Sequence, residues 1–308
     1  MTLSILLVHG IGDNKKDWAI DIIRDLKKKT LSEIKNLVKT DFPEDADAVL
    51  QVSSVYWKDV FEKGEEELRR ILDKAREDDA AHEVKNNPFL RLWQFIRKLL
   101  LRLQNKITTG FVGDIIGYLN ADARVIVYSR ITDSLNQIIS QERSPLTFIT
   151  HSLGTVIASD YIYDKLKVRR LQSFEGFHEK FLLENIFTVG SPLALFSLRY
   201  GGPETFQNPI HVESSFGCWL NIYDKDDPIG MPLKPLNEAY GKAVTDDVKV
   251  EAGVYGLSHI EYFTKSKTLD IIAKKLALDW ARLNNRLSEA DIAKMYGNYN
   301  KDLLGIAS

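Results

Sequence analysis

Residues 146–155 read LTFITHSLGT, and this stretch decides the fold that we expect. Its first five residues are mostly apolar, which is typical of a strand buried on both faces of a parallel sheet. Ser152 follows at a sharp turn, and residues 153–166 have the pattern of an apolar helix in which Gly154 allows close packing. This succession predicts an exposed serine hydroxyl facing the N-terminal amides of the helix. The alternative is a serine that only caps the helix.

The rest of the chain alternates short apolar runs with amphipathic helices. Further strands are expected at residues 3–8, 49–57, 184–189, 218–223 and 248–252. Helices are expected at residues 18–38, 123–139 and 269–283. This alternation predicts an α/β fold with a doubly wound, mostly parallel sheet, in which reactive groups gather at the carboxyl ends of the strands.

Length and composition narrow the class of protein. With 308 residues, of which 44% are hydrophobic, we expect a single domain over residues 1–308 with a sizeable core. The net charge of −2 gives no global attraction to nucleic acid, so no nucleic acid partner is expected. The one cysteine, Cys218, excludes an intrachain disulfide. A secretory signal and a run of about 20 apolar residues are both missing, which predicts a cytoplasmic protein.

Residues 60–120 break the alternation of strands and helices. Residues 62–79 are highly charged, and residues 91–107 carry apolar side chains on one side and basic ones on the other. We therefore expect a helical insertion over residues 60–120. Three roles are open for it: a lid or wall of a substrate pocket, plain packing or an oligomer contact, and contact with a membrane surface through residues 91–107.

Three motifs together resemble one known family. Residues 150–154, THSLG, are similar to a G-x-S-x-G nucleophile elbow with threonine in place of the first glycine. Residues 7–12, LVHGIG, resemble an oxyanion loop, and residues 190–193, GSPL, recur in lipase-like members. The chain thus resembles the α/β-hydrolases, especially lipase-like serine esterases, and residues 60–120 match least. The resemblance implies an α/β-hydrolase fold and a serine nucleophile.

The resemblance also implies a base and an acid for Ser152. A serine hydroxyl is a poor nucleophile until a base takes its proton. The family places that base after the last strand, where His259 lies, and His211 is the alternative. The base requires a carboxylate, for which Asp227 fits best and Asp226 is the alternative, although such acids also form turns. The chain order of serine, aspartate and histidine matches that of the family.

An acyl-transfer site also needs donors for the developing oxyanion. We expect them to be the backbone amides of Ile11 and Leu153, which follow the histidine–glycine pair and the serine. The histidines lack metal-ligand spacing, and no Walker or dinucleotide pattern is convincing. We therefore expect no metal and no cofactor.

The leading hypothesis is hydrolysis of a carboxylic ester, from a small molecule or a lipid, through an acyl-enzyme on Ser152. A phospholipase or deacylase acting at a membrane surface is one alternative, and thioester or amide cleavage is another. A non-catalytic interaction module of the same fold is the third. The sequence leaves open the substrate, the residues that bind it and the oligomeric state.

Overall fold

The structure is a computed structural model that describes residues 1–10, 16–38, 42–61, 117–118, 120–138, 144–164, 181–253, 258–265 and 267–306. The chain divides into two compact units. The larger comprises Met1–Gly10, Asp17–Val55 and Asp133–Ser308, and the smaller comprises Ile11–Lys16 and Tyr56–Thr132. Nearly all of the insertion expected over residues 60–120, including residues 91–107, lies outside the described residues, so its role stays a prediction.

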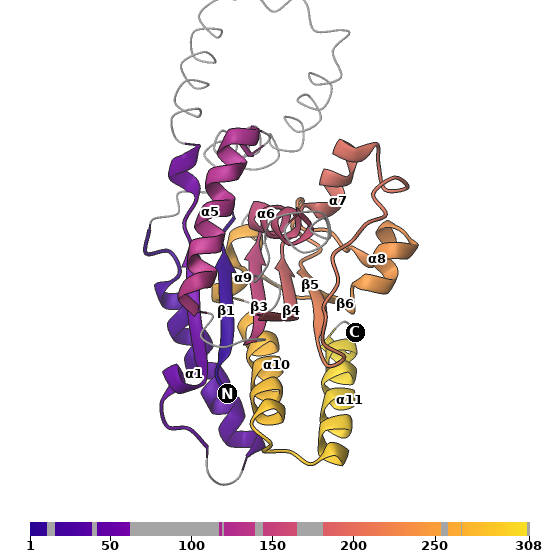
Figure 1. Ribbon diagram of the computed structural model, residues 1–308. Helices are drawn as coiled ribbons and strands as arrows, with labels where there is room; N and C mark the ends of the chain where they lie inside the picture. The colour runs from indigo at the N-terminus through magenta and orange to yellow at the C-terminus, as the bar shows by residue number, and fades with distance from the viewer. Residues whose placement is uncertain are drawn as a thin grey trace, which may run out of the picture. The chain divides into compact units, whose positions relative to one another are not determined.

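The larger unit is built on a six-stranded sheet in which every pair of neighbours is parallel (Figure 1). The strands are β1 (Leu3–Val8), β2 (Leu50–Val55), β3 (Ser144–His151), β4 (Phe181–Val189), β5 (Cys218–Tyr223) and β6 (Asp246–Lys249). Their order across the sheet is β2-β1-β3-β4-β5-β6. This confirms the expected α/β fold with a parallel sheet. The order reverses between β1 and β3, which makes their carboxyl ends the topological switch point where such sheets bind ligands.

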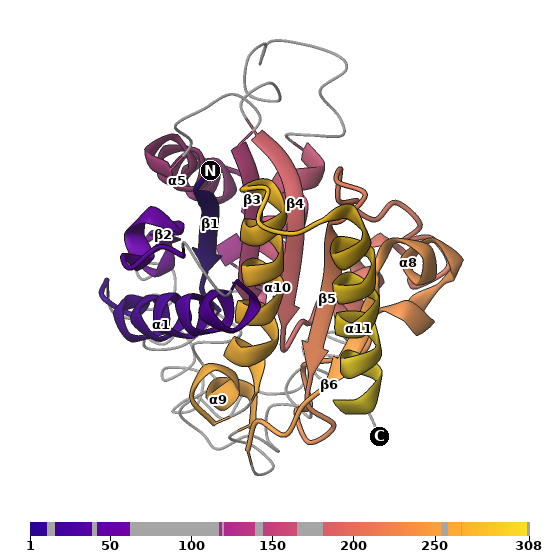
Figure 2. The same ribbon diagram turned by 90° about the horizontal axis from the view of Figure 1, so that it is seen from below.

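Helices flank the sheet on both faces. In Figure 2, α1 (Ile20–Leu37), α10 (Thr268–Leu283) and α11 (Glu289–Ile306) lie on one face. The helix α6 (Leu153–Ile162) packs against β1 and β3 and takes no part in the core beneath those three helices. The other helices are α5 (Ala121–Ile138), α7 (Leu193–Phe196), α8 (Glu238–Ala243) and α9 (Ser258–Lys265). Short 3₁₀ turns cover Ala46–Ala48, Lys58–Val60, Ser197–Tyr200 and Lys234–Leu236.

All six residues of β1 are buried, as expected for a strand covered on both faces. Leu3, Ile5 and Leu7 belong to the core that α1 and α10 cover. Leu6 and Val8 are equally buried and, because side chains alternate along a strand, they point to the opposite face. The apolar run of residues 5–8 follows from this double burial.

Several elements differ from the sequence-based expectation: the short helices α7, α8 and α9 were not expected, and two further differences have a clear physical reason. The last strand was expected at residues 248–252, but β6 runs over Asp246–Lys249. It is polar because the Asp247 carboxylate accepts hydrogen bonds from the amides of Leu233 and Lys234, both at 2.8 Å, so apolarity does not mark the strand. The helix α11 was not expected at all, although Ser288 caps it by accepting a 3.1 Å hydrogen bond from the Asp291 amide.

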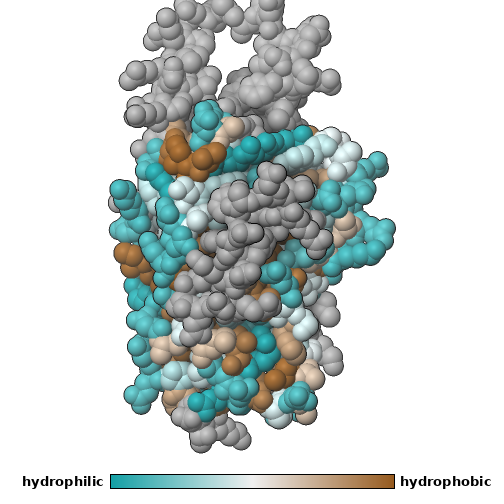
Figure 3. Space-filling model, viewed as in Figure 1, coloured by the Kyte–Doolittle hydropathy of each residue, from teal (hydrophilic) through white to brown (hydrophobic). Residues whose placement is uncertain are grey.

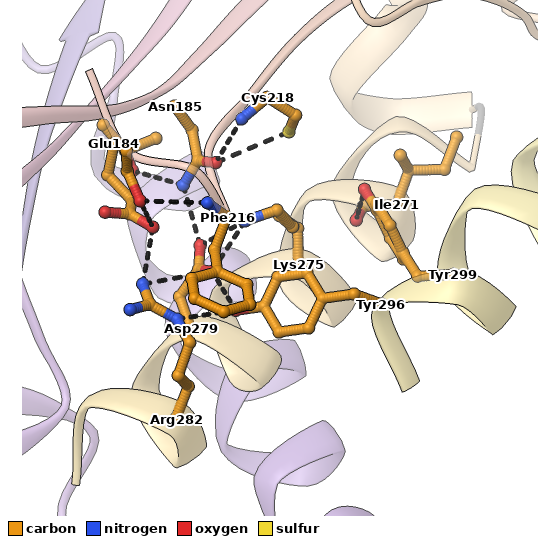
Figure 4. Close-up of polar contacts among 12 residues, drawn as sticks. Glu184, Asn185, Phe216, Cys218, Ile271, Lys275, Asp279, Arg282, Tyr296 and Tyr299 are labelled. Atoms are coloured by element: carbon orange, nitrogen blue, oxygen red, sulfur yellow. Dashed lines mark hydrogen bonds and ion pairs between the residues drawn. The ribbon is translucent and has the colours of Figure 1, made fainter. Parts of the chain in front are cut away.

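A buried ionic network joins α10 and α11 to the sheet (Figure 4). Lys275 donates to both carboxylate oxygens of Asp279, at 2.6 and 2.7 Å. Arg282 pairs with Glu184 of β4 at 2.5 Å, and the Tyr296 hydroxyl of α11 donates to Asp279 at 2.5 Å. Each buried charge thus faces an opposite one, which limits the cost of removing it from water. The network holds the two C-terminal helices in register with β4.

The described surface in the view of Figure 3 mixes polar side chains with small groups of apolar ones. The large apolar side chains that are exposed are scattered along the chain: Met1, Ile20, Val125, Ile126, Leu198, Tyr200, Phe216 and Ile260. Within the described parts of the chain, no helix is both long and apolar enough to cross a bilayer.

Candidate functional site

Ser152 occupies a strained turn between β3 and α6. Its φ of 51° is positive, a conformation that a residue with a side chain adopts only where the surroundings enforce it. The Ser152 amide donates a 3.0 Å hydrogen bond to the carbonyl of Val189 at the end of β4, which holds the turn to the sheet. The strand, turn and helix therefore follow one another as the sequence predicted.

The Ser152 side chain is fully buried, whereas the sequence predicted an exposed hydroxyl. Two neighbours explain the difference. The ring of His259 contacts the hydroxyl, and Gly10 passes so close that a Cβ atom there would lie 2.4 Å from the Ser152 Cβ. Val8 of β1 pairs with Thr150 of β3, so the two chain segments leave the sheet side by side at the switch point.

Gly154 lets α6 approach the end of β1. A Cβ atom at this position would lie 2.3 Å from the carbonyl oxygen of His9 and 2.5 Å from that of Val8. These are backbone atoms that cannot turn aside as a flexible side chain can. The second glycine of the elbow motif is thus required by the packing of the helix on the strand.

Gly154→Ala is expected to lower the free energy of unfolding by about 3 kcal/mol, since the new methyl group forces the helix off the sheet. Gly297→Ala is the matched control, because the exposed Gly297 in α11 has open space where its Cβ would be. Gly297→Ala is expected to raise the free energy of unfolding by about 0.5–1 kcal/mol. Urea unfolding of both variants measures the difference, and equal effects would contradict the packing argument.

The structure brings three of the predicted site residues into one hydrogen-bonded chain. The Ser152 Oγ lies 2.7 Å from the Nε2 of His259, and the His259 Nδ1 lies 2.8 Å from the Oδ2 of Asp227. All three side chains are buried. A carboxylate acceptor fixes the Nδ1 proton of the imidazole, which leaves Nε2 free to accept the serine proton.

The Asp227 carboxylate is held at both oxygens. Its Oδ1 accepts a 2.9 Å hydrogen bond from the amide of Ile229, while its Oδ2 faces His259. Burial alone would raise the pKa of Asp227. The charge and hydrogen bond of His259 and the amides of Ile229 and Gly230 outweigh burial and lower the pKa to about 2. The carboxylate therefore stays ionised at neutral pH, as an orienting acid must.

His151, the residue before Ser152, carries a second imidazole beside the hydrogen-bonded chain. Its ring centroid lies 5.1 Å from that of His259, and its Nε2 lies 2.7 Å from the backbone carbonyl oxygen of His259. Burial, and next the charge of His259, lower the pKa of His151 to about 3. Neutral His151 therefore donates to that carbonyl and anchors the start of α9.

The alternative base, His211, and the alternative acid, Asp226, do not take part in the hydrogen-bonded chain. His211 is exposed, and the ring that reaches Ser152 is that of His259. The Asp226 side chain is 44% exposed and pairs loosely with Lys225 at 3.9 Å, while Asp227 is the carboxylate that contacts the imidazole. One of the two expected oxyanion donors is the amide of Leu153, the first residue of α6 after Ser152. At the start of a helix, this amide has no acceptor within the helix for a hydrogen bond. Ile11 lies outside the described residues.

The departure of Thr150 from the elbow motif has a local explanation. Its hydroxyl donates a 3.0 Å hydrogen bond to the carbonyl of Phe187 on β4, so the larger side chain is buried with its polar atom satisfied. Thr155, on the first turn of α6, also stabilises the turn at Ser152. Its hydroxyl donates to the Ser152 carbonyl at 2.7 Å and lies 2.8 Å from the Ser191 Oγ.

Sequence reasoning missed Tyr262, whose hydroxyl donates to Asp227 Oδ2 at 2.9 Å. One signal was available, because Tyr262 lies three residues after His259 and two such positions share one face of a helix. Among the described residues, no cluster of histidine, cysteine and acidic side chains could hold a metal ion.

Comparison with protein-family models finds no match to this chain, and comparison with curated proteins finds none either. The sheet, the strained turn and the hydrogen-bonded chain are therefore the features that indicate a function.

Proposed function

We propose that this protein is a serine hydrolase of the α/β-hydrolase type that cleaves a carboxylic ester through an acyl-enzyme on Ser152. One observation carries the proposal: the continuous chain from Ser152 through His259 to Asp227, with links of 2.7 and 2.8 Å, at the switch point of a parallel sheet. The order of the three residues along the chain supports the same family. We keep a cytoplasmic location as a prediction.

In the proposed acylation, the Ser152 Oγ attacks the carbonyl carbon of the ester while the Nε2 of His259 takes its proton. Asp227 holds the ring and stabilises the imidazolium that forms. The imidazolium then gives its proton to the leaving alkoxide, and the C–O bond breaks. A water molecule, deprotonated by the same Nε2, then attacks the acyl carbon. The bond from that carbon to the Ser152 Oγ breaks, the imidazolium returns its proton to the Oγ, and the acid leaves.

The negative charge on the tetrahedral intermediate needs donors that are already in place. We propose the amide of Leu153 as one donor, because it opens α6 beside the nucleophile and the helix dipole favours negative charge there. The amide of Ile11 is proposed as the second, because Gly10 already lies against Ser152. Removal of one such donor costs about 3–4 kcal/mol in known acyl-transfer enzymes.

An interaction module of this fold is the alternative from another class. Such a module needs neither a strained serine nor a buried imidazole hydrogen-bonded to it, so both features favour catalysis. A phospholipase or deacylase at a membrane surface, and thioester or amide cleavage, use the same three residues. They stay alternatives because the segment expected to hold the substrate determinants, residues 60–120, lies almost wholly outside the described residues.

Labelling with a fluorophosphonate probe tests the proposal, since the probe reacts with an activated serine regardless of acyl preference. We expect the wild-type protein to gain one adduct, located at Ser152 by peptide mass mapping, and Ser152→Ala to gain none. Ser159→Ala is the matched control, a buried serine further along α6 that should label normally. If the probe does not label the wild-type protein, the proposal is contradicted. If the adduct forms at another serine, the assignment of Ser152 as the nucleophile is contradicted.

A further inference from the structure

We infer that Tyr262 is a positioning residue that holds the Asp227 carboxylate in place for His259. The inference rests on the proposed function, because it assigns a role within the same site. Tyr262 lies on α9 and is fully buried. Its function beyond packing follows from its hydroxyl group.

The partners of this hydroxyl fix the position of its proton. The backbone amide of Asp224 lies 2.8 Å away and can only donate, so the phenol oxygen accepts from it. The phenol proton is then free to point to Asp227 Oδ2, 2.9 Å away, and a carboxylate can only accept. Tyr262 therefore links the loop after β5 to the carboxylate that the same loop carries.

The loops around the phenol are shaped to admit it. A Cβ atom on Gly190 would lie 2.7 Å from the Cε2 of Tyr262, and one on Gly230 would lie 3.0 Å from its hydroxyl oxygen. Gly190 also has a φ of +55°, which glycine adopts without strain. Two glycines from different loops thus form the slot that places the hydroxyl against Asp227.

One helix supplies two donors to one oxygen. His259 and Tyr262 lie three residues apart on α9, and their Nδ1 and hydroxyl groups lie 2.8 and 2.9 Å from Asp227 Oδ2. Because Ile229 donates to Oδ1, the carboxylate is fixed at both ends. Rotation of Asp227 away from the imidazole would break the hydrogen bond from Tyr262 as well as the one from His259.

Four titratable groups face the phenol. Asp224 and Asp227 belong to the loop after β5, His259 belongs to α9, and the His151 ring centroid lies 6.0 Å from that of Tyr262. Burial, and next the charge of Asp227, raise the pKa of Tyr262 far above its ordinary value. The hydroxyl therefore keeps its proton and donates at neutral pH.

Tyr262→Phe removes the donor and keeps the ring in its slot. With one donor fewer, the carboxylate charge is less dispersed and attracts the imidazolium more strongly. The acidic limb of the pH profile for fluorophosphonate labelling is expected to move up by roughly 0.5–1 pH unit, since a hydrogen bond to a charged group shifts an ionisation by about that much. The proton resonance of the His259 Nδ1, identified by its loss in His259→Gln, is expected to move downfield.

Tyr240→Phe is the matched control, because Tyr240 is a buried phenol on α8 outside the site. It should leave both the profile and the resonance unchanged. An unmoved resonance in Tyr262→Phe, with a labelling rate lowered equally at every pH, would overturn the inference and leave Tyr262 a packing residue. The resonance does not require catalysis, so a wild-type protein without labelling defeats the proposed function while the resonance still decides the role of Tyr262.

Discussion

If Ser152 is the nucleophile, as proposed, Ser152→Ala is expected to lower kcat/KM for an activated ester such as a p-nitrophenyl ester by about 10⁴–10⁶-fold, as loss of the nucleophile does in known serine hydrolases. The physical reason is that the Ser152 Oγ is the hydroxyl that lies 2.7 Å from the proposed base, the Nε2 of His259. Steady-state hydrolysis over a range of acyl lengths measures the effect and reports the acyl preference at the same time.

Ser152→Gly separates catalysis from stability. Glycine adopts the φ of 51° without strain, so this variant is expected to unfold at a higher urea concentration than Ser152→Ala while it loses the same activity. Equal stability of the two variants would contradict the claim that the turn is strained. Residual hydrolysis within tenfold of the wild type in either variant would contradict Ser152 as the nucleophile.

Asp227→Asn is expected to lower kcat by about 10⁴-fold, the loss found when the orienting carboxylate of such a triad becomes an amide. An amide can present a donor to the His259 Nδ1, which favours the wrong tautomer and leaves the imidazolium without a counter-charge. Asp226→Asn is the matched control, because the Asp226 side chain is 44% exposed and pairs only loosely with Lys225; this change is expected to alter kcat less than threefold.

The comparison of Asp226→Asn with Asp227→Asn tests which of the two carboxylates serves His259, a choice that the sequence left open. A larger loss in Asp226→Asn than in Asp227→Asn would show that the loop rearranges during catalysis and that the contact of Asp227 with His259 is not the functional one. Equal stability of both variants in urea unfolding would place the difference in the chemistry rather than in folding.

The sequence predicted the parallel α/β fold because its signals are local. The buried strand β1 is apolar except for Ser4, and the elbow around Ser152 requires only ten consecutive residues. It failed at β6, where Asp247 makes the strand polar through contacts with a distant turn. It also missed α11, although the cap at Ser288 was a readable signal.

The sequence by itself determined the nucleophile candidate and the short set of residues able to serve it, because a strand–turn–helix motif and its glycines act within one stretch of chain. Only the tertiary structure joined Ser152 to His259, 107 positions away, since the meeting of loops at the switch point depends on strand order. It also placed Asp227, and not Asp226, against the imidazole, and it brought Tyr262 to the same carboxylate. Which of two adjacent side chains faces inward is set by the conformation of the turn and by the helix packed against it, and neither is encoded within the loop itself.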